Sequence, residues 1–209
     1  MYSIRPMTID DLYVITNVNL DAFTETFAMN FYLHYLSKWP ECCFVAEVAD
    51  GTIAGYMIGK VEGYGLEWHG HCSAVTVAPE YRRTGLANLL MQRLEEICEH
   101  THNCFFMDLF VRPSNVPALT MYRKMGYVVF RTIANYYGGN EDGYDMRKPL
   151  PRDRDLKCLE KSEEKPPGME NFFGNGGAGR GRAEETKAGG QLEDARQQGS
   201  GKRSGKKKK

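Results

Sequence analysis

The stretch between residues 75 and 87 says more about the fold than any other part of this chain. It is Val75-Thr76-Val77-Ala78-Pro79-Glu80-Tyr81-Arg82-Arg83-Thr84-Gly85-Leu86-Ala87. The β-branched run predicts a strand, and the apolar spacing after Gly85 predicts a helix over residues 86–100. Glycine lets the backbone bend and approach a ligand closely, and a helix N-terminus offers unpaired N–H groups and a positive dipole end. The turn is therefore expected to bind phosphate or pyrophosphate.

The pattern of this turn is Arg-x-x-Gly-x-Ala. It differs from the Gly-x-Gly-x-x-Gly of dinucleotide-binding folds and from the Gly-x4-Gly-Lys-Ser/Thr of P-loops. It resembles the acetyl-CoA signature of the GNAT acetyltransferases, whose backbone amides bind the CoA pyrophosphate. So short a pattern also arises by chance as a glycine turn with solvated arginines, so the elements around it must decide.

The remaining elements are expected in the order β-α-α-β-β-β-α-β-α-β-β. They are strand 2–5, helices 8–19 and 31–38, strands 43–48, 53–61 and 67–77, helix 86–100, strand 104–111, helix 115–125, and strands 127–137 and 144–148. Thr8 is the expected N-cap of the first helix, and an Asp50-Gly51 turn joins two strands. The order predicts an α/β (α+β) fold with a mixed sheet, and it is also the order of the GNAT fold.

Composition changes near Pro151. Residues 1–150 carry 12 Lys and Arg against 17 Asp and Glu, and we expect them to form the GNAT domain. Residues 151–209 are rich in glycine and lysine, carry 15 basic against 10 acidic residues, and are expected to be a disordered tail. The acidic domain predicts no DNA partner, whereas the run Lys206 to Lys209 suits weak, salt-sensitive contact with RNA or simple solvation.

The six cysteines show no Cys-x-x-Cys and no metal-ligand spacing, so reduced thiols in a cytoplasmic protein are expected. His69 and His71 share one face of a strand, but further ligands are not evident, so no metal is predicted. Met1 leads straight into a strand without a signal peptide, and no apolar run is long enough for a membrane span. The expected localisation is the cytoplasm.

The GNAT resemblance implies acetyl-CoA as co-substrate and assigns residues to it. The backbone of Val75 and Val77 would hold the pantetheine and the thioester carbonyl. The pyrophosphate would be held by Arg82, Arg83, Gly85, Leu86 and Ala87. Asn115 would lie near the pantetheine, and Tyr122 would be the acid that protonates the CoA sulfur, a role that a phenol can fill.

Three further segments narrow the resemblance: residues 19–27, residues 67–71 and residues 135–148. Together they resemble the catalytic subunits of NatB-type N-terminal acetyltransferases. That family implies acetylation of nascent chains beginning Met-Asp, Met-Glu, Met-Asn or Met-Gln, a large helical-repeat auxiliary subunit, and association with ribosomes. Phe27 departs from the tyrosine expected there, and Asn135 from an acidic residue.

The chemistry of such a substrate suits these segments. Leu20 and Phe27 could line an apolar pocket for methionine, and Glu25 could orient the amine or act through a water. His71 could donate to the second residue, more strongly when protonated. The pair Tyr136 and Tyr137 could bond the peptide backbone, although one of the two could instead be core.

Two alternatives remain open from the sequence. One is a GNAT enzyme for another amine, such as a Ser or Ala N-terminus or a small molecule. The other is a non-catalytic module that binds acyl-CoA, against which the retention of Arg82, Gly85, Asn115 and Tyr122 argues. The general base is not identified, because Glu25 and His71 could each act only through water.

Overall fold

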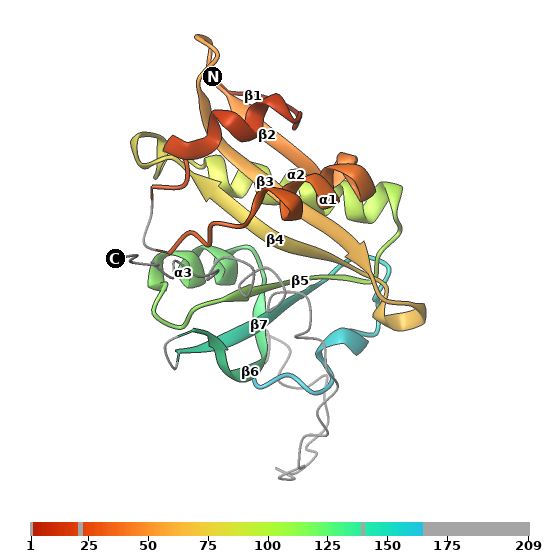
Figure 1. The fold of residues 1–209 in the computed structure, drawn as a ribbon. Coiled ribbons are helices and arrows are strands. Elements are labelled where there is room, and N and C mark those ends of the chain that lie inside the picture. Colours follow the sequence, from red (N-terminus) through yellow and green to blue (C-terminus); the bar gives the residue numbers. More distant parts are fainter. Residues whose placement is uncertain (1, 21–22, 139–140, 165–209) are drawn as a thin grey trace, which may run out of the picture.

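One mixed sheet of seven strands forms the centre of the molecule (Figure 1). The computed structural model describes residues 2–20, 23–138 and 141–164. The strands are β1 (Ser3–Pro6), β2 (Cys43–Glu47), β3 (Ile53–Glu62), β4 (His69–Val77), β5 (Phe106–Val111), β6 (Val128–Tyr137) and β7 (Glu141–Pro149), in the spatial order β1-β2-β3-β4-β5-β7-β6. Only β4 and β5 pair in parallel among these described strands. The predicted mixed sheet is confirmed.

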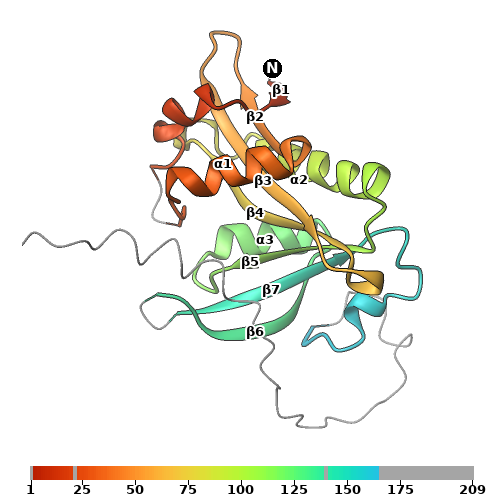
Figure 2. The ribbon, with the colours of Figure 1, turned by 45° about the vertical axis from the view of Figure 1, so that its right-hand side comes forward.

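Helices cover both faces of this sheet (Figures 1 and 2). The helix α1 (Met29–Lys38) packs on one face, where Tyr32 and Tyr35 join a core with the first turns of the chain. On the other face, α2 (Leu86–Glu96) and α3 (Val116–Lys124) bury their apolar sides against the strands. No helix in the described ranges is long and apolar enough to cross a membrane.

The close contact between β4 and the turn that follows α2 depends on Gly70. After α2 the chain continues as a π-helical turn, Ile97–Thr101, which presses Cys98 against the strand. A Cβ on Gly70 would lie 2.3 Å from the Cys98 sulfur and 2.6 Å from the Met107 sulfur. Only glycine fits this close approach.

The strands β4 and β5 are paired along only part of their length. Their ladder runs from His69–Phe106 to Cys72–Leu109. At the end of this ladder the register between β3 and β4 shifts, leaving Ser73 as a bulge residue. The bulge turns Ser73 toward α1, where its hydroxyl donates to the Tyr35 hydroxyl at 2.9 Å. Beyond it, Val75 and Val77 pair with β3 alone among the described strands.

The helix predicted over residues 8–19 is wrong. The structure has two short 3-10 turns instead, Asp10–Tyr13 and Ile15–Asn17. The Asp11 carboxylate accepts from the Thr8 backbone N–H at 2.7 Å, from the Thr8 hydroxyl at 2.9 Å and from the Arg5 guanidinium at 2.8 Å. The hydrogen bond from Arg5 is the main reason that the pKa of Asp11 falls to about 2. These bonds tie the turn to β1, and Thr8 is not an N-cap.

The prediction of a disordered segment from residue 151 onward is wrong for residues 151–164. The buried Asp153 carboxylate accepts the backbone N–H groups of Lys157 and Cys158, each at 2.9 Å, and so organises the 3-10 turn Lys157–Leu159. Cys158 and Leu159 are buried against β5 and β6. This segment lies beside β6 and β7 in Figure 1 (cyan). The rest of the predicted tail, residues 165–209, lies outside the described residues.

The packing of this C-terminal segment predicts a stability effect. We expect Leu159→Ala to lower the free energy of unfolding by about 2–5 kcal/mol, because it empties a buried site. Lys161→Ala, two residues further on and exposed, should change it by less than about 0.5 kcal/mol. Urea denaturation of the two variants measures the difference, and equal midpoints would contradict the packing.

Candidate active site

The turn before α2 has the backbone shape expected of a phosphate site. Gly85 lies at φ +88° and Arg83 at φ +64°, which is unusual for a residue with a Cβ. The Arg82 side chain donates from Nε to the Val77 carbonyl at 3.1 Å, and the Thr84 hydroxyl donates to the Tyr81 carbonyl at 2.7 Å. Within the described part of the chain no side chain caps this helix. Its first N–H groups can therefore bind an anion.

Asn115 stands at the start of α3, as predicted, and its side chain caps that helix. The Oδ1 atom accepts the backbone N–H of Ala118 at 3.2 Å. This bond fixes the orientation of the amide. A contact of Asn115 with pantetheine would therefore use the NH₂ group.

The Tyr122 ring lies on the face of the sheet that α2 and α3 cover. It belongs to the same core as Cys72 and Leu109, and its exposed fraction is 6%. Burial raises the pKa of Tyr122 well above 10, and the Cys72 thiol and the Tyr137 phenol add to the effect. The phenol therefore keeps its proton at neutral pH and can act only as a donor of it.

Four of the predicted substrate residues lie in one line of contacts on the opposite side. Glu25 forms an ion pair with Arg112, whose guanidinium lies 4.0 Å from the Tyr137 ring centroid. The Tyr137 ring contacts Tyr136 at 4.9 Å, the Tyr136 ring contacts Phe110 at 4.8 Å, and the Phe110 ring contacts His71 at 5.4 Å. We call this set, Glu25, His71, Phe110, Arg112, Tyr136 and Tyr137, the peptide-side cluster.

Sequence reasoning gave no role to Phe110, Arg112 or the nearby Asp108. All three belong to β5 or its end and alternate with the core residues Leu109 and Val111. That alternation was visible in the sequence and places the three side chains on one face. Their partners were not visible, because they depend on how β5 is aligned with its neighbours.

Burial also affects the two tyrosines of the cluster. It raises the pKa of both phenols above their ordinary range, and the Arg112 guanidinium opposes the shift for Tyr137. Both therefore stay protonated and can donate hydrogen bonds at neutral pH. Neither is fully buried, so the expectation that one could be core is not met.

Leu20 and Phe27 lie together, at a cavity whose lining includes no residue of the peptide-side cluster. They line an apolar cavity of about 350 Å³ between the first turns of the chain and α1. Its lining is Leu12, Ile15, Thr16, Asn19, Leu20, Thr26, Phe27, Met29 and Tyr32. Neither Glu25 nor His71 is among these residues. The structure thus brings the two predicted methionine contacts together.

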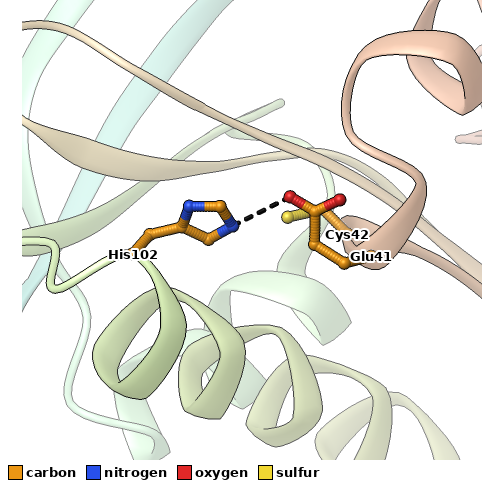
Figure 3. Close-up of side chains that lie close together, drawn as sticks. All are labelled: Glu41, Cys42 and His102. Atoms are coloured by element: carbon orange, nitrogen blue, oxygen red, sulfur yellow. Dashed lines mark ion pairs between the residues drawn. The ribbon is translucent and has the colours of Figure 1, made fainter.

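A separate group of possible metal ligands lies near the C-terminal end of α2 (Figure 3). The ligand atoms of Glu41, Cys42 and His102 lie within 4.8 Å of one another. The His102 Nε2 atom is 2.9 Å from a Glu41 oxygen but has no hydrogen-bond partner within the described residues. The contact is therefore close without being a hydrogen bond.

Comparison with known proteins gives a consistent assignment. The family model "Acetyltransferase (GNAT) family" matches residues 9–127. N-alpha-acetyltransferase 20 of Dictyostelium discoideum is 54% identical over 159 residues, which are 76% of this chain and 92% of that protein. The N-terminal acetyltransferase B complex catalytic subunit NAA20 of Arabidopsis thaliana is 52% identical over 159 residues, 76% of this chain and 91% of that protein.

Solved structures agree with these relatives. The crystal structure of Chaetomium thermophilum Naa20 with a bisubstrate analogue has a TM-score of 0.72 and 41% identity, covering 75% of this chain and 91% of that one. The NatB acetyltransferase complex bound to a bisubstrate inhibitor has a TM-score of 0.68 and 41% identity, covering 72% of this chain and 91% of that one. The chain therefore belongs to the GNAT acetyltransferases and, within them, to the family of NatB catalytic subunits.

The positive φ of Gly85 predicts a graded effect on cofactor binding. A Cβ at this position meets no atom within 4 Å, so the cost of Gly85→Ala is backbone strain, about 1 kcal/mol or more. Gly85→Asn should cost less, because asparagine tolerates the left-handed region better. We expect calorimetric affinity for CoA to fall in the order glycine, asparagine, alanine. An alanine variant that binds as well as the parent would contradict a strained turn at the phosphate site.

Proposed function

We propose that this protein transfers the acetyl group of acetyl-CoA to the α-amino group of polypeptides that begin Met-Asp, Met-Glu, Met-Asn or Met-Gln. One observation carries the proposal: β4 leaves β5 after Cys72, with Tyr122 on one face of the sheet and the peptide-side cluster on the other. This arrangement lets the pantetheine of CoA and the peptide approach a shared thioester from opposite sides. The relatives support N-terminal acetylation, and the resemblance of residues 19–27, 67–71 and 135–148 implies the substrate class.

The reaction needs only modest proton transfer. An α-amino group titrates near pH 8, so desolvation or a weak base gives the neutral nucleophile. Its nitrogen attacks the thioester carbonyl, and backbone N–H groups along the unpaired end of β4 would stabilise the oxyanion. The C–S bond then breaks, Tyr122 gives its proton to the thiolate, and the ammonium proton leaves to solvent through Glu25 or His71. The phenol recovers a proton from water.

The peptide-side cluster suits a short recognition sequence. Arg112 holds Glu25 in place, so its carboxylate can orient the incoming amine. Tyr136 and Tyr137 are protonated donors that could bond the peptide backbone without reading its side chains. His71 could contact the second residue, and Leu20 with Phe27 offers apolar surface to methionine.

Exposed apolar side chains on the first turns and α1 support a protein partner. They are Ile9, Tyr13, Val14, Phe23, Met29 and Leu33, with Tyr13 72% exposed. Apolar patches of this kind mark interaction surfaces. We assign this one to the large helical-repeat auxiliary subunit of a NatB complex, which would link the enzyme to ribosomes and nascent chains in the cytoplasm. RNA contact by the basic tail is a further part of this proposal.

The role of Tyr122 can be tested against a neighbouring tyrosine. We expect Tyr122→Phe to lower kcat by about 10²–10⁴, the usual effect of a general acid, with little change in CoA affinity. Tyr127→Phe is the control, because its ring contacts Tyr122 and its hydroxyl bonds to Glu95 at 3.0 Å. It should cost stability and leave kcat nearly unchanged. Equal losses of kcat in the two variants would mean that Tyr122 only packs.

A peptide panel tests the substrate class. Peptides beginning Met-Asp, Met-Asn, Ser-Glu and Ala-Glu, together with a free polyamine, would be compared in a CoA-release assay of the chain with its auxiliary subunit. We expect the Met-Asp and Met-Asn peptides to give the highest kcat/KM. Preference for Ser-Glu or the polyamine would indicate a GNAT enzyme for another amine. CoA binding without turnover on any substrate would favour a non-catalytic module.

A further inference from the structure

Three side chains of metal-ligating type meet outside the acetyl-transfer site. Glu41 and Cys42 belong to the 3-10 turn Pro40–Cys42 before β2, and His102 follows the π-helical turn after α2. Figure 3 shows the three side chains pointing toward one another, and their ligand atoms lie within 4.8 Å of one another. The α2 helix, 11 residues and about 16 Å long, separates this group from the phosphate-binding turn at its other end.

The His102 imidazole has an unused ligand atom. Its Nε2 atom is buried and has no hydrogen-bond partner within the described residues, although a Glu41 oxygen lies 2.9 Å away. Native structures give almost every buried polar atom a partner, because leaving it without one costs free energy. An imidazole nitrogen is the commonest metal ligand in proteins. A metal ion bound to Nε2 would supply the missing partner.

The surrounding hydrogen bonds hold these ligands in place. The Trp68 indole N–H donates to the His102 carbonyl at 2.9 Å, and the Cys42 backbone N–H donates to the Trp39 carbonyl at 3.0 Å. Cys42 is fully buried in the core that α2 covers. The side chains of Glu41 and His102 are 40% and 20% exposed. An ion can therefore arrive from solvent between the carboxylate and the imidazole and reach the sulfur beneath them.

We propose that Glu41, Cys42 and His102 bind one Zn²⁺ ion, which joins the turn before β2 to the turn after α2. Thiolate, imidazole and carboxylate are the three ligand types of zinc, whereas Mg²⁺ and Ca²⁺ prefer oxygen alone. Tetrahedral bonds of about 2.0–2.3 Å place ligand atoms about 3.3–3.6 Å apart. That separation lies between the 2.9 Å of the Glu41–His102 contact and the 4.8 Å limit of the group. Water fills the fourth position.

The ion has a structural role in this position. When it binds, a zinc–sulfur bond replaces the S–H bond of Cys42, and the thiol proton leaves to solvent. The ligands come from two separate segments, so the site exists only in the folded chain and zinc stabilises that state. The same separation hid the site from sequence analysis, which searches for short ligand spacings. The inference does not rest on the proposed function, because it uses none of the residues assigned to acetyl transfer.

Metal titration of the full chain provides the first test. After treatment with a chelator, the chain would be titrated with Zn²⁺ by calorimetry and with Co²⁺ by absorption spectroscopy. We expect one ion per chain and a thiolate-to-cobalt charge-transfer band, which requires a sulfur ligand. At a free zinc concentration of about 100 times Kd, Tm should rise by about 5–10 °C. Absence of binding, a Co²⁺ complex without the thiolate band, or an unchanged Tm overturns the proposal.

Substitution of each ligand locates the ion. His102→Gln and Glu41→Gln alter partly exposed side chains, so both variants should fold, and each should weaken zinc binding by at least about tenfold. Cys42→Ala should remove the thiolate band of the Co²⁺ complex. Zinc affinity that is unchanged in His102→Gln overturns the proposal even if Cys42→Ala fails to fold.

Two neighbouring residues provide matched controls. His100 is an exposed histidine of the same turn, and Cys43 is a buried thiol that belongs to the core on the opposite face of the sheet. His100→Gln and Cys43→Ala should both keep the zinc affinity of the parent chain. The Cys98 thiol, which interacts with the Cys42 thiol, is the remaining competitor. Binding that is lost in Cys98→Ala but kept in His102→Gln would place the ion among the core thiols and overturn the proposal.

Discussion

The separation of β4 from β5 is the constraint on which the rest of the structure depends. It begins where the parallel ladder ends at Cys72–Leu109 and the bulge at Ser73 rotates β4. Without this separation, the backbone N–H and C=O groups of Val75 and Val77 would be hydrogen-bonded to strands on both sides. The bulge also decides which side chains reach each face: Cys72 turns toward α2 and α3, and Ser73 turns toward α1.

Much of the fold could be predicted because local signals agree with it. The β-branched strand, Gly85 and the amphipathic α2 all specify the same strand–turn–helix unit, and the final arrangement keeps it. The predictions failed where a buried carboxylate accepts hydrogen bonds that organise a turn. Asp11 bonds to Arg5 on β1 and Asp153 organises a turn beyond the expected domain end, and neither contact has a periodicity that a sequence reveals.

The site was predictable in its residue types and only partly in its geometry. Tyr122 lies in the core that α2 and α3 cover, and Glu25, His71, Tyr136 and Tyr137 lie in one line of contacts. Asp108, Phe110 and Arg112 were missed because their importance comes from register and from long-range contact. The Glu25–Arg112 pair, for example, joins residues 87 positions apart. Composition cannot reveal such a contact, since a lone arginine after a strand is usually solvated.

Arg112 has a consequence for how this protein can diverge. One of its guanidinium nitrogens holds Glu25 in the loop before α1, and another holds Glu141 at the start of β7, 2.8 Å away. Glu141 in turn accepts from the Ser114 hydroxyl just before α3. The loop before α1, the start of β7 and the turn before α3 are thus joined through Arg112 and Glu141. An insertion or substitution in any one of them is transmitted to the other two, so these loops are expected to change together or not at all.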